Sequence, residues 1–127
     1  MDEQRPVTAT RRLVVSDADT ALALGSGDVA VLGTPRVVAL LEEAAVAAVG
    51  GSLEPTDTTV GTQISIEHLA PSPIGSEIDA TAELVSAEGR LYRFEVQAVM
   101  GDTVVARGTH TRVRVRREGF GQPRDGA

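Results

Sequence analysis

The segment Thr34–Val49, TPRVVALLEEAAVAAV, is followed by two glycines and decides the fold of this chain. Thr34 is a favoured N-cap residue, Pro35 suits the first helical position, and the glycines can end a helix in the left-handed conformation. Sixteen residues with a rise of 1.5 Å each would form a helix of roughly 24 Å. The segment is apolar almost all round, so we expect a buried helix. Only Glu42 and Glu43 interrupt it, and at least one of them must reach solvent.

The composition predicts one globular domain without a nucleic-acid partner. The 127 residues are 42% apolar, with two Phe, one Tyr and no Trp, so the core must consist of Val, Ala, Leu and Ile. The chain has no cysteine, which excludes disulfides and thiolate metal sites and fits a reducing cytosol. It also lacks a membrane-length apolar run and a signal-peptide apolar region, so we expect a cytoplasmic protein and no membrane partner. The net charge of −6 and the few aromatic residues argue against nucleic-acid binding.

Five segments are predicted to be strands, one before the helix and four after it: 9–16, 58–70, 76–86, 90–100 and 103–116. In the second of them, alternation places Val60, Thr62, Ile64, Ile66 and His68 on one face. Segments 88–89 and 101–102 are expected to be tight turns. Segment 17–27 is expected to form turns, a short helical turn or a lid.

This order of elements predicts an α+β fold in which a curved antiparallel sheet wraps around one long central helix. The domain is expected to span residues 9–117, between a flexible N-terminus, 1–8, and a flexible C-terminal tail, 118–127. A sheet of this kind has edges, and pairing one edge with a second copy protects it. We therefore expect a homodimer.

The candidate chemistry rests on Glu42 and His68. His68 lies on the strand face that should cover the helix, and Glu42 lies on that helix. A carboxylate and an imidazole in an apolar crevice shift each other's pKa, which makes a general base or nucleophile plausible near neutral pH. Thr34 adds a hydroxyl and the free N–H groups of the helix start, which can hold a carbonyl oxygen as it becomes negative. Gly61 adds an unobstructed backbone N–H.

Each candidate also has a structural interpretation. Thr34 can be a plain N-cap, Glu42 can be solvated, and His68 can be a structural histidine. His110 is a weaker site candidate. Arg112 begins an alternating run of three arginines, which could meet a phosphate, although a solvated edge strand is favoured.

No metal site is expected, because the two histidines lie far apart without a carboxylate at ligand spacing. The sequence also lacks a phosphate-binding loop and a nucleophile elbow.

Several short motifs follow one another in a fixed order along the chain. They are TP-x6-E from Thr34, VGT-x5-H from Val60 with LAPSPIG after it, GR-x3-F from Gly89, and G-x-H-x-R from Gly108. Each motif alone is weak, but the ordered set resembles the hotdog-fold thioesterases, and within them the fluoroacetyl-CoA thioesterase-like family. The resemblance runs from about residue 14 to residue 115.

This resemblance implies a hotdog fold, a homodimer and an acyl-CoA pocket at the subunit interface. It implies a catalytic set of Thr34, Glu42 and His68, with Gly61 on the oxyanion side and Arg112 in the pocket. Coenzyme A would enter as part of the substrate, without a separate cofactor.

The predicted function is therefore hydrolysis of a small or medium acyl-CoA thioester, with Glu42 as base or nucleophile. The alternative is a non-catalytic hotdog protein that binds acyl-CoA or a similar small ligand. A hydratase is less favoured, because no hydratase-type Asp/His motif is present. In the fluoroacetyl-specific enzyme, aromatic residues before the helix resemble a lid over the small acyl group. The segment Gly25–Gly33 has no aromatic residue, so fluoroacetate selectivity is not predicted. The acyl group and its carrier, CoA or an acyl-carrier protein, stay open.

Overall fold

The structure is a computed structural model that describes residues 7–122. The outer parts of the expected flexible ends, 1–6 and 123–127, lie outside the described residues. The first strand begins at Val7, two residues before the expected start, and pairs there with Leu84. After the last strand the chain forms a turn, and Arg117 holds this segment through its backbone N–H to the carbonyl of Thr56 at 2.9 Å.

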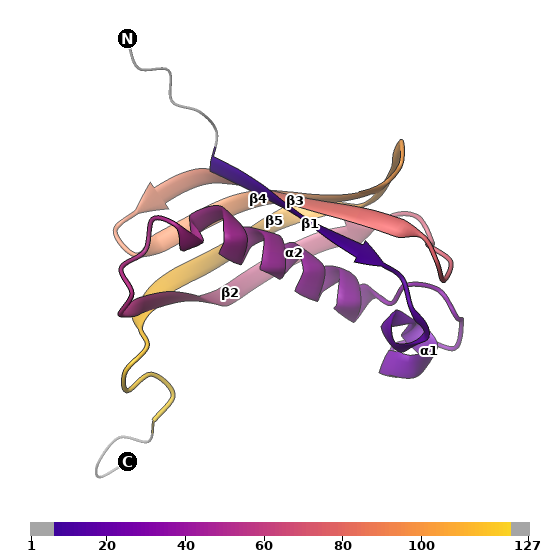
Figure 1. Ribbon diagram of the computed structural model, residues 1–127, viewed down its shortest axis with the longest axis horizontal. Coiled ribbons are helices and arrows are strands. Elements are labelled where there is room, and N and C mark those ends of the chain that lie inside the picture. Colours follow the sequence, from indigo (N-terminus) through magenta and orange to yellow (C-terminus); the bar gives the residue numbers. More distant parts are fainter. Residues whose placement is uncertain (1–6, 123–127) are drawn as a thin grey trace.

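The predicted α+β architecture is confirmed, with one long helix lying along a five-stranded antiparallel sheet (Figure 1). The strand order in the sheet is β1-β3-β4-β5-β2. In chain order the elements are β1 (Val7–Val14), the 3-10 helix η1 (Asp17–Asp19), α1 (Ala21–Leu24), α2 (Thr34–Gly50), β2 (Asp57–His68), β3 (Glu77–Glu88), β4 (Leu91–Met100) and β5 (Thr103–Arg116). The edges of the sheet are β1 and β2. The interpretation of the arginine-rich last strand as an edge strand is therefore wrong, since β5 lies between β4 and β2.

The two ends of α2 differ from the prediction. The N-cap is Gly33, whose carbonyl accepts from the backbone N–H groups of Arg36 and Val37. Thr34 is already helical, so its interpretation as the N-cap is wrong. At the other end Gly51 has φ −72°, a right-handed conformation, so the expected left-handed ending is also wrong.

One face of α2 forms the core with the sheet. Its buried residues are Val37, Leu40, Leu41, Ala44, Ala45 and Val49. They pack against the inward faces of β3 and β4, whose predicted alternation is confirmed because Ile78, Ala80 and Ala82 are buried, as are Phe94, Val96 and Ala98. Burial is not complete around the helix, since Val46 on the opposite side is 45% exposed. Within the described residues, no helix combines the length and hydrophobicity that a membrane span needs.

A β-bulge changes which residues of β2 face the helix. Gly61 pairs with Arg112, but Gln63 pairs with Thr111, so Thr62 has no partner in the ladder. An extra residue in one strand reverses the alternation beyond it. As a result, Thr59 and Gly61 share the helix-facing side with the second half of the strand. The prediction that Val60 and Thr62 face the helix together with His68 is therefore wrong.

The segment between β1 and α2 forms η1 and α1, which confirms the expected short helical turn. It is fastened to α2 by Arg36, whose side chain pairs with Asp19 of η1 at 3.2 Å and with Glu43 at 3.1 Å. The Glu43 side chain is 50% exposed, so it is the carboxylate of the pair Glu42 and Glu43 that reaches solvent most freely.

The close approach of β5 to β2 predicts a strong effect of Gly108→Ala. A Cβ at this position would overlap the carbonyl oxygen of Ser65, and backbone atoms cannot move aside as a side chain can. We expect the free energy of unfolding to fall by at least about 2 kcal/mol. Urea unfolding at one fixed protein concentration measures this.

The control for that measurement is Gly50→Ala, because a Cβ there meets nothing within 4 Å and alanine favours a helix. This variant should be as stable as the wild type or more stable. Equal stabilities of the two variants would contradict the packing argument.

Candidate active site

The first polar cluster joins the start of α2 to the end of β2. The hydroxyl of Thr34 hydrogen-bonds Nδ1 of His68 at 2.7 Å. The other ring nitrogen, Nε2, is buried and has no hydrogen-bond partner among residues 7–122. Burial lowers the pKa of His68 below its ordinary value of 6.5, so the ring is neutral near neutral pH and can accept a proton. The helix N-terminus, with its free N–H groups, lies at the same place.

An open pocket of about 360 Å³ lies beside this pair. Thr34 and His68 line it together with two short segments, 26–29 before the helix and 69–71 after β2. Its apolar side chains are small or aliphatic and include Ala21, Val29 and Leu69, and none of its lining residues is Phe, Tyr or Trp. A second, larger pocket of about 740 Å³ lies over the polar face of the sheet, among residues such as Glu67 and Glu95, and contains none of the predicted site residues.

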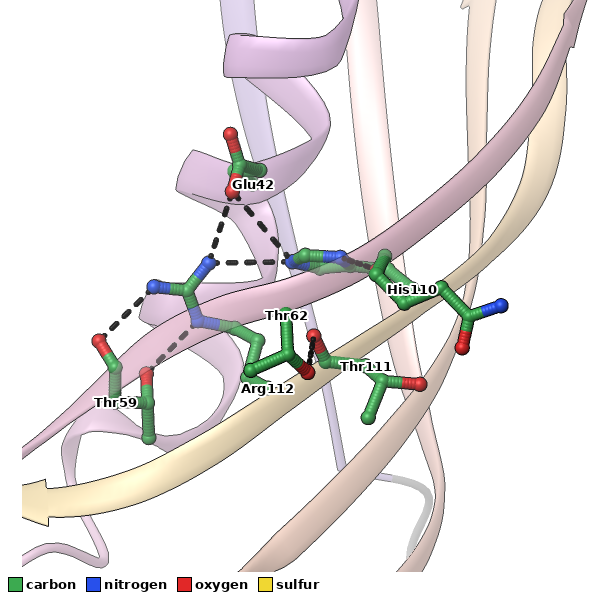
Figure 2. Close-up of polar contacts among 7 residues, drawn as sticks. Glu42, Thr59, Thr62, His110, Thr111 and Arg112 are labelled. Atoms are coloured by element: carbon green, nitrogen blue, oxygen red, sulfur yellow. Dashed lines mark hydrogen bonds and ion pairs between the residues drawn. The ribbon is translucent and has the colours of Figure 1, made fainter.

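The second polar cluster surrounds Glu42 in the middle of α2 (Figure 2). Its carboxylate oxygen Oε2 accepts a hydrogen bond from Nη1 of Arg112 at 3.3 Å. The guanidinium is buried, whereas the Glu42 side chain is 38% exposed. Among residues 7–122, the other carboxylate oxygen, Oε1, has no hydrogen-bond partner. Glu42 therefore presents one fixed oxygen to the protein and one free oxygen to the outside.

Arg112 is fixed by further bonds to the edge strand. Its Nε donates to the hydroxyl of Thr59 at 2.9 Å, and its Nη2 donates to the Thr59 carbonyl at 3.0 Å. Burial lowers the pKa of Arg112, and the charge of Glu42 opposes that shift. An arginine keeps its charge in proteins, so a cation stands permanently beside the carboxylate.

His110 completes the second cluster from β5. Its Nδ1 lies 2.7 Å from the carbonyl oxygen of Gln63, and its Nε2 lies 3.2 Å from Nη1 of Arg112. The distance from Nε2 to Oε2 of Glu42 is 4.0 Å. Burial is the main cause that lowers the pKa of His110, with Arg112 acting in the same direction and with the Gln63 carbonyl and Glu42 opposing it.

Because Gly61 has no side chain, there is room beside it for this cluster. A Cβ at residue 61 would lie 2.6 Å from Oε2 of Glu42, 3.1 Å from Nη1 of Arg112 and 3.2 Å from Cε1 of His110. A side chain would thus displace the carboxylate from the guanidinium. The bulge turns Gly61 towards the helix, and the hydroxyl of the bulged Thr62 donates to the Thr111 carbonyl at 3.3 Å (Figure 2).

The structure brings the predicted residues together in two groups. Thr34 contacts His68, and Glu42 lies against Gly61 and Arg112. Glu42 and His68 do not touch within the described part of one chain. Thr34 and Glu42 are eight residues apart on α2, which corresponds to about 12 Å along the helix axis. The catalytic assignment itself stays a prediction.

Two members of the site were missed or given little weight from the sequence. Thr59 was not a candidate, because uninterrupted alternation put it on the outer face. A glycine inside a strand pattern is a signal for a bulge, and a bulge at Gly61 would have turned Thr59 inward. His110 was a weak candidate because nothing in the sequence aligns it with Glu42. Within residues 7–122, no group of three or more His, Cys, Asp or Glu side chains is placed to hold a metal ion.

Comparison with known proteins finds similar sequences. A family model described as fluoroacetyl-CoA-specific thioesterase, FlK, matches residues 15–118. The fluoroacetyl-CoA thioesterase of Streptantibioticus cattleyicolor is 39% identical over 90 residues. That alignment covers 71% of this chain but only 65% of the relative, so about a third of the relative lies outside the match.

Solved structures are similar over almost the whole chain. A Phe-to-Ala mutant of FlK in complex with fluoroacetate and CoA superposes with a TM-score of 0.86 at 32% identity, covering 93% of this chain and 99% of that one. A hot-dog-like protein from Thermanaerovibrio acidaminovorans has a TM-score of 0.80 at 21% identity, with coverage of 88% and 83%. The second similarity shows the fold alone, and together the structures confirm the predicted hotdog fold.

The two buried histidines predict a dependence of stability on pH. Their pKa values are lowered from 6.5 in the folded chain, so the unfolded chain binds more protons as the pH falls through that value. The free energy of unfolding should therefore decrease from pH 7.5 to pH 5.5, by at most about 1.4 kcal/mol per pH unit for each group. Urea unfolding at fixed protein concentration measures the slope.

The double variant His68→Gln, His110→Gln removes both titrating rings and should show a flatter pH profile over this window. A slope as steep as that of the wild type would assign the effect to other groups.

Proposed function

Because the chain belongs to the fluoroacetyl-CoA-specific thioesterase family, we propose that it hydrolyses a small or medium acyl-CoA thioester. The observation that carries this proposal is the fixed carboxylate of Glu42, which points one free oxygen outward from a buried Arg112. A similar structure with fluoroacetate and CoA bound supports the choice of substrate. The neutral His68, hydrogen-bonded to Thr34 beside a pocket, supplies a second group for proton transfer.

In the proposed reaction, the carbonyl carbon of the thioester is attacked by water, with Glu42 as the base, or by Glu42 itself. The carbonyl oxygen becomes negative and is held by backbone N–H groups at the start of α2 in one subunit and at Gly61 of the partner subunit, in the dimer proposed below. The carbon–sulfur bond then breaks, and in the water route His68 passes the proton that Glu42 removed from water to the CoA thiolate. If Glu42 attacks directly, an anhydride between the acyl group and Glu42 forms, the thiolate takes its proton from solvent through His68, and water hydrolyses the anhydride in a second step. The products are the free acid and CoA.

The acyl group is proposed to occupy the pocket beside Thr34 and His68. Its volume of about 360 Å³ and its lining of small aliphatic residues, such as Val29 and Leu69, suit a short or medium aliphatic chain. Asp28 also lines the pocket, and its negative charge would repel an acyl group that carries a free carboxylate. Selectivity for fluoroacetate is not part of the proposal, because no Phe, Tyr or Trp among residues 7–122 lines the pocket.

We also propose a homodimer, in the cytoplasm, with the active site at its interface. Two features of one chain support this. The edge strand β2 carries half of the site and has no neighbour on its outer side in the described sheet. Val46 lies one helical turn beyond Glu42 on α2 and is 45% exposed, so an apolar surface continues from the site.

The geometry of an edge-to-edge dimer would join the two polar clusters. His68 ends β2, and Gly61 lies seven residues earlier in the same strand. If two copies of β2 pair antiparallel about a twofold axis near Ser65, His68 of one copy stands beside Gly61 of the other. Since Gly61 touches Glu42, the site would consist of Thr34 and His68 from one subunit and Glu42 from its partner.

The first test is hydrolysis of a panel of short and medium acyl-CoAs. Glu42→Gln and His68→Ala should each lower kcat/KM by about 100-fold or more, the range for loss of a general base or acid. The matched control is Glu43→Gln, which removes the adjacent, exposed carboxylate and should leave turnover near the wild-type rate.

Equal hydrolysis by all variants at matched folding would refute the assignment. Thermal-shift titration with the same acyl-CoAs runs in parallel. Binding by the wild type without any turnover would favour the non-catalytic, acyl-CoA-binding alternative.

The second test is complementation between inactive subunits. A mixture of Glu42→Gln and His68→Ala chains should regain about a quarter of the wild-type activity, because half of the dimers are mixed and each mixed dimer holds one intact site of two. If both residues of a site come from one chain, every site in the mixture is defective and no activity returns. The chains are mixed after unfolding and refolding together, and sedimentation establishes the dimer.

A further inference from the structure

We infer that His110 is a positioning residue for the proposed reaction: as a neutral imidazole with its proton on Nδ1, it accepts a hydrogen bond from Arg112 and so aims that guanidinium at Glu42. This inference rests on the proposed function for its kinetic part only. Its structural part is the position of the proton on the His110 ring, which does not depend on that function.

The position of that proton follows from the two partners of His110. A backbone carbonyl can only accept, and the carbonyl of Gln63 lies 2.7 Å from Nδ1, so Nδ1 carries the proton. The guanidinium of Arg112 can only donate, and its Nη1 lies 3.2 Å from Nε2, so Nε2 carries a lone pair. The two contacts fix one tautomer of the neutral ring. A proton on Nε2 would point at the Arg112 cation.

The ring itself cannot turn away from these partners. The side chain of His110 is 1% exposed. On one side it stacks on Phe94, with 6.0 Å between the ring centres and 30° between the ring planes. Burial also favours the neutral form, because it lowers the pKa of His110. His110 therefore offers Arg112 a lone pair in a fixed place.

That lone pair bears directly on Glu42. Nη1 of Arg112 donates both to Nε2 of His110 and to Oε2 of Glu42, at 3.2 and 3.3 Å. The two bonds to Thr59 hold Nε and Nη2, which lie on the other side of the planar guanidinium. Without His110, Nη1 keeps only one acceptor, the half-exposed carboxylate. The Arg112 guanidinium can then tilt about its two hydrogen bonds to Thr59, and Glu42 loses its fixed orientation.

The tautomer is tested without any substrate. The chain has two histidines, so ¹⁵N-histidine labelling gives two ring systems, and a His68→Gln variant assigns them. At pH 7, His110 should show a protonated Nδ1 and an unprotonated Nε2. A protonated Nε2, alone or together with Nδ1, overturns the inference whether or not the protein is an enzyme.

The kinetic part is tested with two amide variants that keep different halves of the ring. In His110→Gln the side-chain oxygen can take the place of Nε2 and still accept from Arg112. In His110→Asn the shorter amide can reach the Gln63 carbonyl but not Arg112. We expect His110→Asn to lower kcat about tenfold or more with less than about a twofold change in KM. We expect His110→Gln to stay within about threefold of the wild-type kcat.

Equal losses in the two amide variants overturn the positioning role, because both remove a buried ring and disturb the core alike. Val96→Ala in β4 is the control for core loosening, since it should lower stability without lowering kcat. If the wild type hydrolyses no acyl-CoA, the proposed function fails, and the labelling experiment still decides the tautomer.

The path through Arg112 is tested by adding His110→Asn to Arg112→Lys. A lysine cannot reproduce the fork, so the double variant should be no slower than Arg112→Lys alone. A double variant whose loss is the product of the two single losses would show that His110 acts independently of Arg112.

Discussion

The burial of the Arg112 guanidinium away from water constrains the whole candidate site around Glu42. Transfer of an ion into a protein interior costs several kcal/mol unless hydrogen bonds and an opposite charge compensate. Arg112 meets that requirement with acceptors from three elements: Thr59 on β2, His110 on β5 and Glu42 on α2. These hydrogen bonds fix the distances between α2, the edge strand β2 and the neighbouring strand β5. The orientation of Glu42 is a result of the sheet as much as of its own helix.

The bulge in β2 makes this arrangement possible. Without the bulge, the register of the second half of β2 would place Thr62 opposite Arg112 in the position of Gly61, where a side chain has no room beside Glu42. The extra residue Thr62 instead turns Gly61 and Thr59 inward. Gly61 supplies the space, and Thr59 supplies hydrogen-bond acceptors for Arg112. A local irregularity in an edge strand thus prepares a pocket for two opposite charges.

Much of the fold could be predicted from the sequence, because hydrophobic periodicity reports directly on burial. The long helix and the inward faces of β3 and β4 follow from it. The candidate catalytic residues Thr34, Glu42 and His68 were chosen from spacing and family resemblance, and their roles stay a prediction. What periodicity cannot report is the order of strands in a sheet, so the last strand was interpreted as an edge.

The remaining errors have local causes. One hydroxyl can serve as a helix cap or bind a neighbouring histidine, and composition does not choose between these roles for Thr34. The grouping of Glu42 with His110 required the register of β2 against β5, which depends on the bulge. Sequence reasoning put Glu42 and His68 in one crevice of one chain, but the described chain places them in separate polar clusters.

The separation of the two polar clusters has a consequence for how this scaffold can change. The pocket beside Thr34 and His68 is lined by segments 26–29 and 69–71, and within one chain it lies about 12 Å along the helix from the carboxylate at residue 42. Within one chain, substitutions so far apart have nearly additive effects on the free energy of unfolding. The cavity can widen, narrow or change polarity while the charged pair keeps its surroundings. The stability of the fold can therefore absorb a change in the pocket and a change in the charged cluster independently of each other.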